Sequence, residues 1–465
     1  MTDLSLSEQF SQATLAYQSG DLLHAQQLYQ TLLSKAPDHA ESHYNLAAIY
    51  ARQDVWLAAI EHYKQALKQY PTAGPILYNL SAALVREQQF GAAITYLQTL
   101  LQQDPEHAAG HYLLAVIFMG SHELEKAEEH FLKAKKELSM DPDLHYNLGV
   151  VSLHRQDWAQ AKAYFLHAVT LNPTYLDALF NLAKIAEHEH ETEQIRDYLE
   201  KCIQISADYF DAYYELVQWH KAKKDYAQAL HYINIALKLR PHHPTLAFTH
   251  DVLSHKTGLN KAPIDYVKAL FDGYAASYEE HLTKKLQYHL PQWIYEKTQS
   301  YLKPVDYRLL DLGCGTGLNG VYWRRRVNHL VGVDISAEML AQARQKKIYD
   351  AIYENDIVDF LQKPGSYDLI IAADVWEYFG ELSDVFAHIH ARLTVEGLFV
   401  FSTEMGLHFP FLLNMNGRFT HHHDYIKDLL QQQYFTLLEC DVITLRQQEG
   451  EEVQGELWIA QKELH

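Results

Sequence analysis

The segment Arg308-Leu-Leu-Asp311-Leu-Gly313-Cys-Gly315-Thr-Gly317 decides the fold of the C-terminal part of the chain. An apolar strand runs into a glycine-rich turn, and a helical stretch follows from Leu318 to Arg326. Glycine lets a backbone approach a ligand closely, and a helix N-terminus favours a negative group. A dinucleotide fingerprint would require glycine at position 318, which is leucine. The segment therefore predicts a cofactor site that does not bind a dinucleotide.

Further apolar runs follow, with the rhythm of an α/β domain. The second predicted strand ends at Asp334, 21 residues after Gly313, where a carboxylate can accept both ribose hydroxyls of a nucleoside. The third leads to Asn355-Asp356-Ile357, the fourth ends at Asp374, and Gly397 to Ser402 forms the fifth. We expect these strand ends to meet in one cleft.

This pattern resembles the cofactor motif of class I (Rossmann-like) methyltransferases, and Ser336-Ala-Glu-Met339-Leu resembles the helix start that follows the second strand. The resemblance implies S-adenosylmethionine as the cofactor. By the same resemblance, Asp356 would bond the adenine amino group and Ile357 would pack on the ring. The expected cofactor-binding residues are Asp311, Gly313, Cys314, Gly315, Gly317, Asp334, Ile335, Met339, Asp356, Ile357 and Asp374.

Proline recurs in the N-terminal half at intervals of 34 residues or multiples of 34, a period typical of the tetratricopeptide repeat (TPR). Small residues that let two helices pack closely recur in the same register. We predict seven helix pairs from about Ser5 to Pro241 and a capping helix from Pro244 to His255. The periodic prolines are Pro37, Pro71, Pro105, Pro173 and Pro241, and the alanines are Ala25, Ala59, Ala93, Ala127, Ala161 and Ala229.

Two ladders mark the first helix of the repeats. Aromatic residues stand at one equivalent position, and asparagine follows in four copies. An amide offers a donor and an acceptor, so on the concave surface a file of asparagines can hold an extended protein or peptide segment. Alternatively, both residues serve the repeat stack. The asparagines, expected to bind substrate, are Asn45, Asn79, Asn147 and Asn181.

The expected organisation is multidomain: an all-α TPR solenoid (1–255), a linker (256–263), a helical cap (264–304) and an α/β Rossmann-like class I methyltransferase domain (305–465). The segment Phe271 to Tyr278 resembles the helical cap that many small-molecule methyltransferases have over the cofactor. Tyr274 and Tyr278 are therefore expected to contact the substrate.

The C-terminal part also resembles predicted bacterial methyltransferases fused to TPRs, through Ala372 to Gly380, Gly417 to His421 and Leu445 to Gly450. His421, Tyr425, Glu404 and Tyr378 are candidate catalytic proton acceptors or substrate anchors. The guanidinium groups of Arg418 and Arg446 could hold a substrate carboxylate. For each, the alternative is a structural hydrogen bond. An Asn-Pro-Pro-Tyr motif is absent, which favours oxygen, imidazole or a basic amine as the methyl acceptor.

Composition excludes other classes of function. The net charge of −20 disfavours nucleic acid as a partner. No stretch has the length of a membrane helix, no secretory signal opens the chain, and three dispersed cysteines indicate a reducing, cytoplasmic location. Consecutive histidines rarely bind one ion, so His421-His422-His423 predicts no metal.

Two alternative functions remain: a small-molecule O- or N-methyltransferase whose repeats only assemble a complex, and a TPR scaffold with a vestigial cofactor domain.

Overall fold

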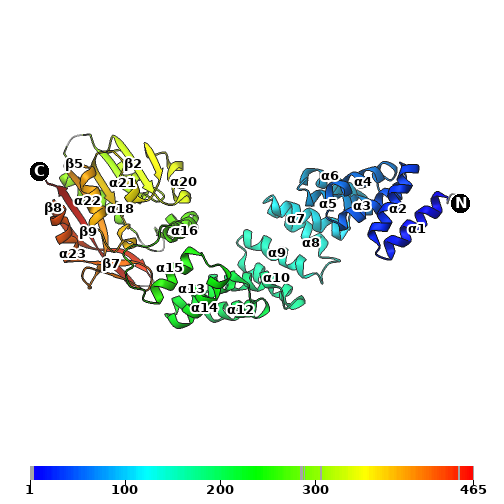
Figure 1. The fold of residues 1–465 in the computed structure, drawn as a ribbon, viewed down its shortest axis with the longest axis horizontal. Helices are drawn as coiled ribbons and strands as arrows, with labels where there is room; N and C mark the ends of the chain where they lie inside the picture. Colours follow the sequence, from blue (N-terminus) through cyan, green and yellow to red (C-terminus); the bar gives the residue numbers. More distant parts are fainter. Residues whose placement is uncertain (1–4, 283–285, 287, 304–305, 449–450, 464–465) are drawn as a thin grey trace. The chain divides into compact units, whose positions relative to one another are not determined.

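The chain was analysed as a computed structural model that describes residues 5–282, 286, 288–303, 306–448 and 451–463 (Figure 1). It forms two compact units, Met1–Ala212 and Tyr213–His465. The division falls inside the helix Phe210–Ala222, so most of the seventh helix pair belongs to the second unit.

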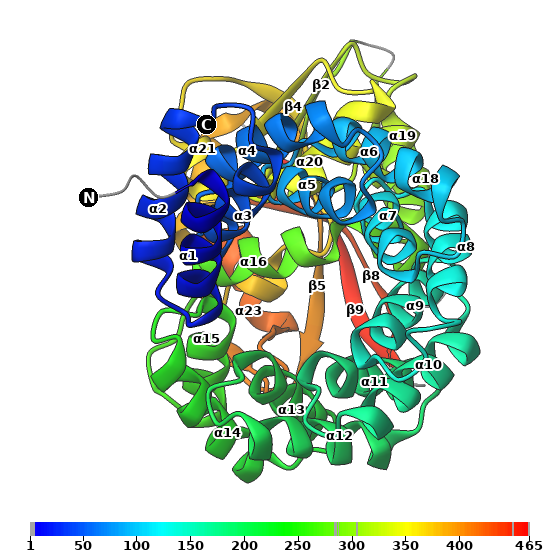
Figure 2. The same cartoon turned by 90° about the vertical axis from the view of Figure 1, so that its right-hand side faces the viewer.

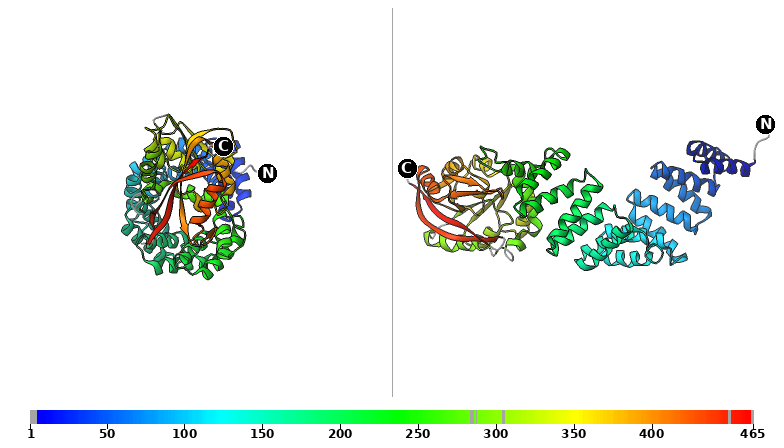
Figure 3. Two further views of the ribbon diagram at one scale, coloured as in Figure 1. Left: turned by 90° about the vertical axis from the view of Figure 1, so that its left-hand side faces the viewer. Right: turned by 90° about the horizontal axis from the view of Figure 1, so that it is seen from below.

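The first unit is a stack of antiparallel helix pairs in chain order (Figure 3). Each short turn between helices leaves the next helix to pack on the previous one, which is the geometry of a solenoid. Its helices are α1 (Leu6–Gln18), α2 (Leu22–Lys35), α3 (Ala40–Arg52), α4 (Trp56–Gln69), α5 (Gly74–Arg86), α6 (Phe90–Gln103), α7 (Ala108–Gly120), α8 (Leu124–Ala134), α9 (Pro142–His154), α10 (Trp158–Leu171), α11 (Leu176–His188) and α12 (Thr192–Ile205).

One backbone feature repeats with the predicted period. The residue that ends the turn after the first helix of each pair has a left-handed conformation, and its seven copies are spaced by 34 residues. All six predicted alanines are fully buried, where their small side chains allow the two helices of a pair to approach. The left-handed residues are Gly20, Asp54, Gln88, His122, Gln156, His190 and Lys224.

The second unit begins with α13 (Phe210–Ala222), α14 (Tyr226–Leu239) and α15 (Pro244–Leu253), which complete the predicted seven pairs and the capping helix. The capping helix is integrated into the following domain. Phe248 on α15 packs against Tyr266 on α16 (Ile264–Tyr274), with ring centroids 4.4 Å apart. Both side chains are buried in the core of the α/β domain.

A mixed sheet organises the α/β domain. Parallel strands run in the order β3-β2-β1-β4-β5, and β9 adds to β5 as an antiparallel strand that pairs with β8 (Figure 2). A small extension, β7 and β6, continues from the end of β5. The strands are β1 (Arg308–Leu312), β2 (His329–Asp334), β3 (Ala351–Glu354), β4 (Tyr367–Ala372), β5 (Leu393–Gly406), β6 (Phe411–Leu413), β7 (Phe419–His422), β8 (Phe435–Gln448) and β9 (Glu451–Lys462).

Helices flank the sheet, and the apolar strands are buried between them, as expected of a parallel sheet. Trp323, Trp376 and Trp458 are fully buried around the sheet. The flanking helices are α18 (Leu290–Thr298), α19 (Leu318–Trp323), α20 (Ala337–Lys346), α21 (Ile357–Leu361), α22 (Ser383–Arg392) and α23 (His423–Gln432).

The predicted linker 256–263 is not a free tether. The carbonyl of Asn260 accepts hydrogen bonds from the N–H groups of Gly380 (2.8 Å) and Glu381 (3.1 Å), and the N–H of Ala262 donates to the carbonyl of Tyr378 (2.8 Å). The segment thus satisfies backbone groups of the loop after β4. The limits of the expected domains otherwise stay an interpretation, and the boundary at 304/305 lies outside the described residues.

Across the described part of the chain, no helix combines the length and apolar character that a membrane crossing requires.

Candidate functional site

The glycine turn after β1 has the conformation that its sequence predicts. Gly313, Gly315 and Gly317 all have positive φ, at 65°, 53° and 92°. A side chain at Gly313 would also collide with Val375, whose Cγ2 would lie 2.5 Å from the added Cβ. The turn therefore needs glycine both for its backbone and for its close approach to the loop after β4.

Asp334 at the end of β2 stabilises this turn through hydrogen bonds to backbone N–H groups. Its Oδ2 accepts the N–H of Gly315 (2.8 Å) and its Oδ1 accepts the N–H of Ser336 (2.9 Å). Burial raises the pKa of this carboxyl, while the backbone donors act in the opposite direction. Each oxygen keeps a further lone pair, so Asp334 can still accept ligand hydroxyls.

Asp356 follows β3, and its two carboxylate oxygens have different hydrogen-bond partners. Oδ1 caps α21 by accepting the N–H groups of Val358 (2.8 Å) and Asp359 (3.3 Å). Oδ2 accepts a bond from Nζ of Lys261, 2.9 Å away, in the segment before α16. The ammonium of Lys261 also lies 4.6 Å from the ring centroid of Phe379.

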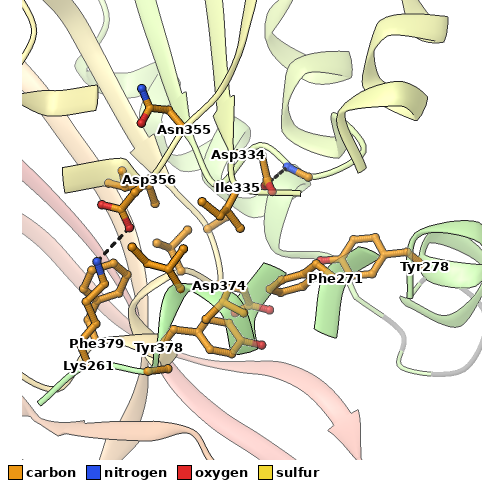
Figure 4. Close-up of a pocket in the computed structure, with 18 residues that line it drawn as sticks. Lys261, Phe271, Tyr278, Asp334, Ile335, Asn355, Asp356, Asp374, Tyr378 and Phe379 are labelled. Atoms are coloured by element: carbon orange, nitrogen blue, oxygen red, sulfur yellow. Dashed lines mark hydrogen bonds and ion pairs between the residues drawn. The ribbon is translucent and has the colours of Figure 1, made fainter. Parts of the chain in front are cut away.

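These groups surround one cavity with an empty volume of about 720 Å³, which is open to solvent (Figure 4). Gly315, Asp334, Asp356 and Asp374 lie on the sheet side, and Phe271 and Tyr278 come from the predicted cap. Seven predicted cofactor residues line this cavity: Gly313, Gly315, Asp334, Ile335, Asp356, Ile357 and Asp374.

Four other predicted cofactor residues do not line this cavity, and each has a packing role. Asp311 is fully buried in β1 and accepts bonds from Oη of Tyr349 (2.7 Å) and from Asn319 (3.3 Å); burial raises its pKa to about 7. Gly317 turns the chain into α19, and Met339 is a buried residue of α20. Cys314 lines a smaller adjoining cavity of about 300 Å³, together with Tyr278 and Tyr288.

A cluster of buried charges lies behind the cavity wall. Nη1 of Arg418 lies 2.9 Å from Oε1 of Glu404 and 3.6 Å from Oε1 of Glu377, and Arg446 pairs with Glu404 and, at 3.6 Å, with Asp374. The two arginines thus already pair with protein carboxylates, and their binding of a substrate carboxylate stays a prediction. Their charge outweighs the effect of burial and holds the pKa of Glu404 below its usual range, so Glu404 is a poor proton acceptor.

Three of the four catalytic candidates, Glu404, His421 and Tyr425, lie outside the cavity. His421 is fully buried on β7, its Nε2–H donates to the carbonyl of Phe379 (2.8 Å), and burial lowers its pKa to about 4. Tyr425 accepts the N–H of Leu382 (2.9 Å) and donates to Glu381 (3.2 Å), which fixes the loop before α22. His421 and Tyr425 therefore satisfy backbone groups instead of facing a ligand.

Tyr378 is the catalytic candidate that lines the cavity. Its ring contacts Phe271, with centroids 5.5 Å apart, and its Oη lies 3.5 Å from Nη2 of Arg418. Burial raises its pKa. Tyr278 also lines the cavity, as predicted for the cap, whereas Tyr274 is 44% exposed and contacts His281. Tyr274 does not line this cavity, and its contact with a substrate stays a prediction.

The asparagine ladder of the first unit links neighbouring repeats. Nδ2 of Asn79 donates to Oη of Tyr44 (3.0 Å), and Nδ2 of Asn147 donates to Oη of Tyr112 (2.8 Å), each pair 35 residues apart. The equivalent partner of Asn45 is Phe10, which has no hydroxyl, and Asn45 instead donates to Tyr29 (2.9 Å). Each amide keeps a second N–H and a carbonyl oxygen.

Asn181 differs in that it donates to the carbonyl of Asp177 in its own helix (2.8 Å). The role of the ladder in peptide binding stays a prediction.

Sequence reasoning missed Lys261, Glu377 and Phe379. Lys261 is 95 residues from Asp356, and no sequence pattern indicates that they meet. Glu377 stood inside the recognised motif after β4 but was not assigned a role. Glu449 and Gly450 of the last recognised motif lie outside the described residues.

The sheet order with an antiparallel β9, the glycine turn after β1 and the acidic strand ends define a class I, Rossmann-like methyltransferase domain. A family model described as a methyltransferase domain matches residues 310–399. Three tetratricopeptide-repeat models match residues 10–74, 84–148 and 142–175. The chain is therefore a tetratricopeptide-repeat protein that carries a methyltransferase domain.

Two curated relatives share the methyltransferase region. Malonyl-[acyl-carrier protein] O-methyltransferase of Bacillus cereus is 27% identical over 141 residues, 29% of this chain and 50% of that protein. The protein of the same name from Legionella pneumophila is 31% identical over 145 residues, 30% of this chain and 49% of that protein. The chain thus spans about half the length of these curated relatives.

A solved structure resembles the repeats. The C-terminal part of a TPR repeat-containing protein from Cytophaga hutchinsonii matches at 17% identity and a TM-score of 0.44, covering 51% of this chain and 98% of that one.

Proposed function

We propose that this chain is an S-adenosylmethionine-dependent methyltransferase. The observation that carries the proposal is the meeting of the glycine turn after β1 with Asp334, Asp356 and Asp374 around one cavity. The donor set fits an adenosyl ligand, because carboxylates accept bonds from ribose hydroxyls and from an exocyclic amino group. The turn fits as well, since its three glycines have positive φ and carry no side chain that would keep a ligand away from the backbone.

The proposed roles follow from the positions of the side chains. Asp334 accepts the ribose hydroxyls, Asp356 accepts the adenine amino group through Oδ2, and Ile357 packs on the ring. Phe271 and Tyr278 of the predicted cap line the same cavity and would lie against the cofactor.

The bound cofactor would supply an already activated methyl group on a sulfonium. The chain would then hold the acceptor in line with that group, and orientation supplies most of the acceleration. Tyr378 lines the cavity and is the candidate that can contact an acceptor directly. Glu404 serves to hold Arg418 and Arg446, so its role is to position the cavity wall and not to move a proton.

We further propose that the solenoid recruits a protein or peptide that carries the methyl acceptor. The two relatives are named malonyl-[acyl-carrier protein] O-methyltransferase, a name that points to an acceptor carried on a protein. An acceptor carried on a protein is the kind of substrate for which a linked binding module raises the effective concentration. The repeat fold and the remaining amide groups of Asn45, Asn79 and Asn147 support this role.

Affinity purification with the full chain, followed by a methyl-transfer assay on the captured protein, tests recruitment. Weakening the solenoid contact should slow transfer at low substrate concentration and leave the rate at high concentration nearly unchanged. A small-molecule methyltransferase would instead modify free small acceptors at a rate that solenoid variants do not alter. A vestigial scaffold would capture the partner without binding S-adenosylmethionine.

Calorimetry with the full chain tests the cofactor. We expect S-adenosylmethionine and S-adenosylhomocysteine to bind at one site and NAD to show no competition, because Leu318 stands where a dinucleotide site requires glycine. Binding of NAD in preference to both adenosyl compounds would contradict the proposal.

A further inference from the structure

Three side chains with metal-binding atoms meet on the α23 side of the β8–β9 ribbon, away from the cofactor cavity. They are His423 at the start of α23, Cys440 on β8 and Glu456 on β9. One ligand atom of each lies within 4.8 Å of the other two. Cys440 pairs with Trp458 and Val442 with Glu456, so Cys440 and Glu456 are diagonal neighbours on one face.

The Glu456 carboxylate is incompletely satisfied. The residue is 3% exposed, its Oε1 lies 2.7 Å from Nδ1 of His423, and its Oε2 has no hydrogen-bond partner among the described residues. A buried carboxylate with an unpaired oxygen is costly unless a cation or donor compensates it. The half-exposed imidazole of His423 gives solvent access to this carboxylate.

Cys440 adds a soft ligand to the cluster. Burial, and then the neighbouring Glu456 carboxylate, raises the pKa of its thiol to about 12. A divalent cation reverses this effect, because coordination favours the thiolate and releases its proton. Nitrogen, sulfur and carboxylate oxygen together suit zinc, whereas magnesium and calcium prefer oxygen alone.

We propose that His423, Cys440 and Glu456 form a zinc-binding site whose fourth ligand is water. Tetrahedral zinc holds its ligand atoms roughly 3–4 Å apart, and the imidazole ring of His423 can move to reach that geometry. The ion fastens the start of α23, and with it the neighbouring β7, to the β8–β9 ribbon that carries Arg446. The sequence did not suggest the site, because its members are 17 and 16 residues apart and belong to no spaced motif.

Cobalt(II) titration of the zinc-free full chain tests the site, because a thiolate ligand gives cobalt a charge-transfer absorption. We expect one equivalent of cobalt to produce this band, and zinc to abolish it by displacement. The Cys440→Ser variant should lose the band and bind zinc at least ten-fold more weakly. Cys202→Ala is the matched control, since Cys202 is a buried thiol in the first unit and its removal should leave the band unchanged.

His423→Gln provides a second variant that keeps the β8–β9 packing, because its side chain is half-exposed. Zinc should raise the unfolding temperature of the wild type and not that of His423→Gln, while circular dichroism of both apoproteins stays alike. Absence of the thiolate band in the wild type, or a band that persists in Cys440→Ser, would overturn the proposal. His423 and Glu456 would then form a plain ion pair. Neither outcome depends on whether the chain binds S-adenosylmethionine.

Discussion

Nζ of Lys261 lies 2.9 Å from Oδ2 of Asp356, so a residue before the first cap helix contacts the loop after β3 inside the cofactor cavity. Oδ1 of Asp356 already caps α21, so Lys261 holds the other carboxylate oxygen, Oδ2.

Lys261→Met should therefore weaken binding of S-adenosylhomocysteine. The lost ion pair is partly exposed, and pairs of this kind contribute about 0.5–1 kcal/mol, which corresponds to a roughly two- to five-fold change in Kd. Lys268→Met is the matched control, because Lys268 pairs with Glu354 at 2.6 Å outside the cavity. Equal effects of the two variants in calorimetry would remove Lys261 from the site.

The buried charge cluster gives a stability prediction. Glu404→Gln leaves Arg418 and Arg446 with less compensating charge and should lower the free energy of unfolding by about 3 kcal/mol or more. Glu396→Gln breaks an exposed pair with Lys303 and should cost about 1 kcal/mol at most. Denaturant unfolding checks both. If Glu404→Gln kept full stability and lost only the methyl-transfer rate, Glu404 would be a proton acceptor after all.

Two variants in the asparagine ladder can distinguish a role in repeat stacking from a role in peptide binding. Tyr44→Phe removes the hydroxyl that accepts from Asn79 and should reduce stability by about 1 kcal/mol while leaving the asparagine amide in place for a partner. Asn79→Asp can still bond Tyr44, now as acceptor, but it no longer offers an N–H to a peptide. Affinity for the partner and the thermal unfolding temperature are measured for both variants. We expect the affinity to fall only in Asn79→Asp. A loss of affinity in Tyr44→Phe alone would mean that stacking controls binding.

Histidine pairs make the solenoid sensitive to acid. Nδ1 of His130 lies 2.8 Å from Nδ1 of His111. Burial lowers the pKa of His130 to about 4, with smaller contributions from His111 and Lys133. The nearby carboxylate of Glu129 acts in the opposite direction. The folded pKa lies below the unfolded value of 6.5, so this contribution to stability is present above pH 6.5 and is lost as the pH falls towards 4.

The matched change is His130→Tyr, because tyrosine stands at the equivalent position in four other repeats: Tyr96, Tyr164, Tyr198 and Tyr232. This variant should reduce the slope of unfolding free energy against pH between 4 and 6.5 by up to about 1.4 kcal/mol per pH unit. Denaturant titrations at several pH values measure the slope. An unchanged slope would show that His130 titrates normally in the folded protein.

The parts of this protein that local sequence determines were predictable. A period of 34 residues specifies the helix pairs, and acids after apolar strands must gather at one sheet edge because parallel strands end together. Side-chain pairing was not predictable. Arg418 could have bound a substrate or a protein carboxylate, and only the packing of β5, β7 and β8 brings Glu404 to it.

The other contacts that the sequence did not predict join residues that are far apart along the chain. Lys261 and Asp356 meet because the supposed linker bonds to the loop after β4, which no local pattern encodes. His421 matched a recognised motif, yet its side chain is committed to the carbonyl of Phe379, 42 residues away. A motif identified the segment correctly in this case and did not reveal which way its side chain points.

The central claim is that Asp334 and the glycine turn hold an adenosyl cofactor, and calorimetry of Asp334→Asn with S-adenosylhomocysteine tests it most directly. The variant keeps the size of the side chain but loses the charge that would accept ribose hydroxyls. Charge-assisted bonds contribute about 1.5–3 kcal/mol each, so we expect binding at one site in the wild type and a loss of affinity of ten-fold or more in the variant. Unchanged affinity in the variant, or no binding by the wild type, would contradict the account.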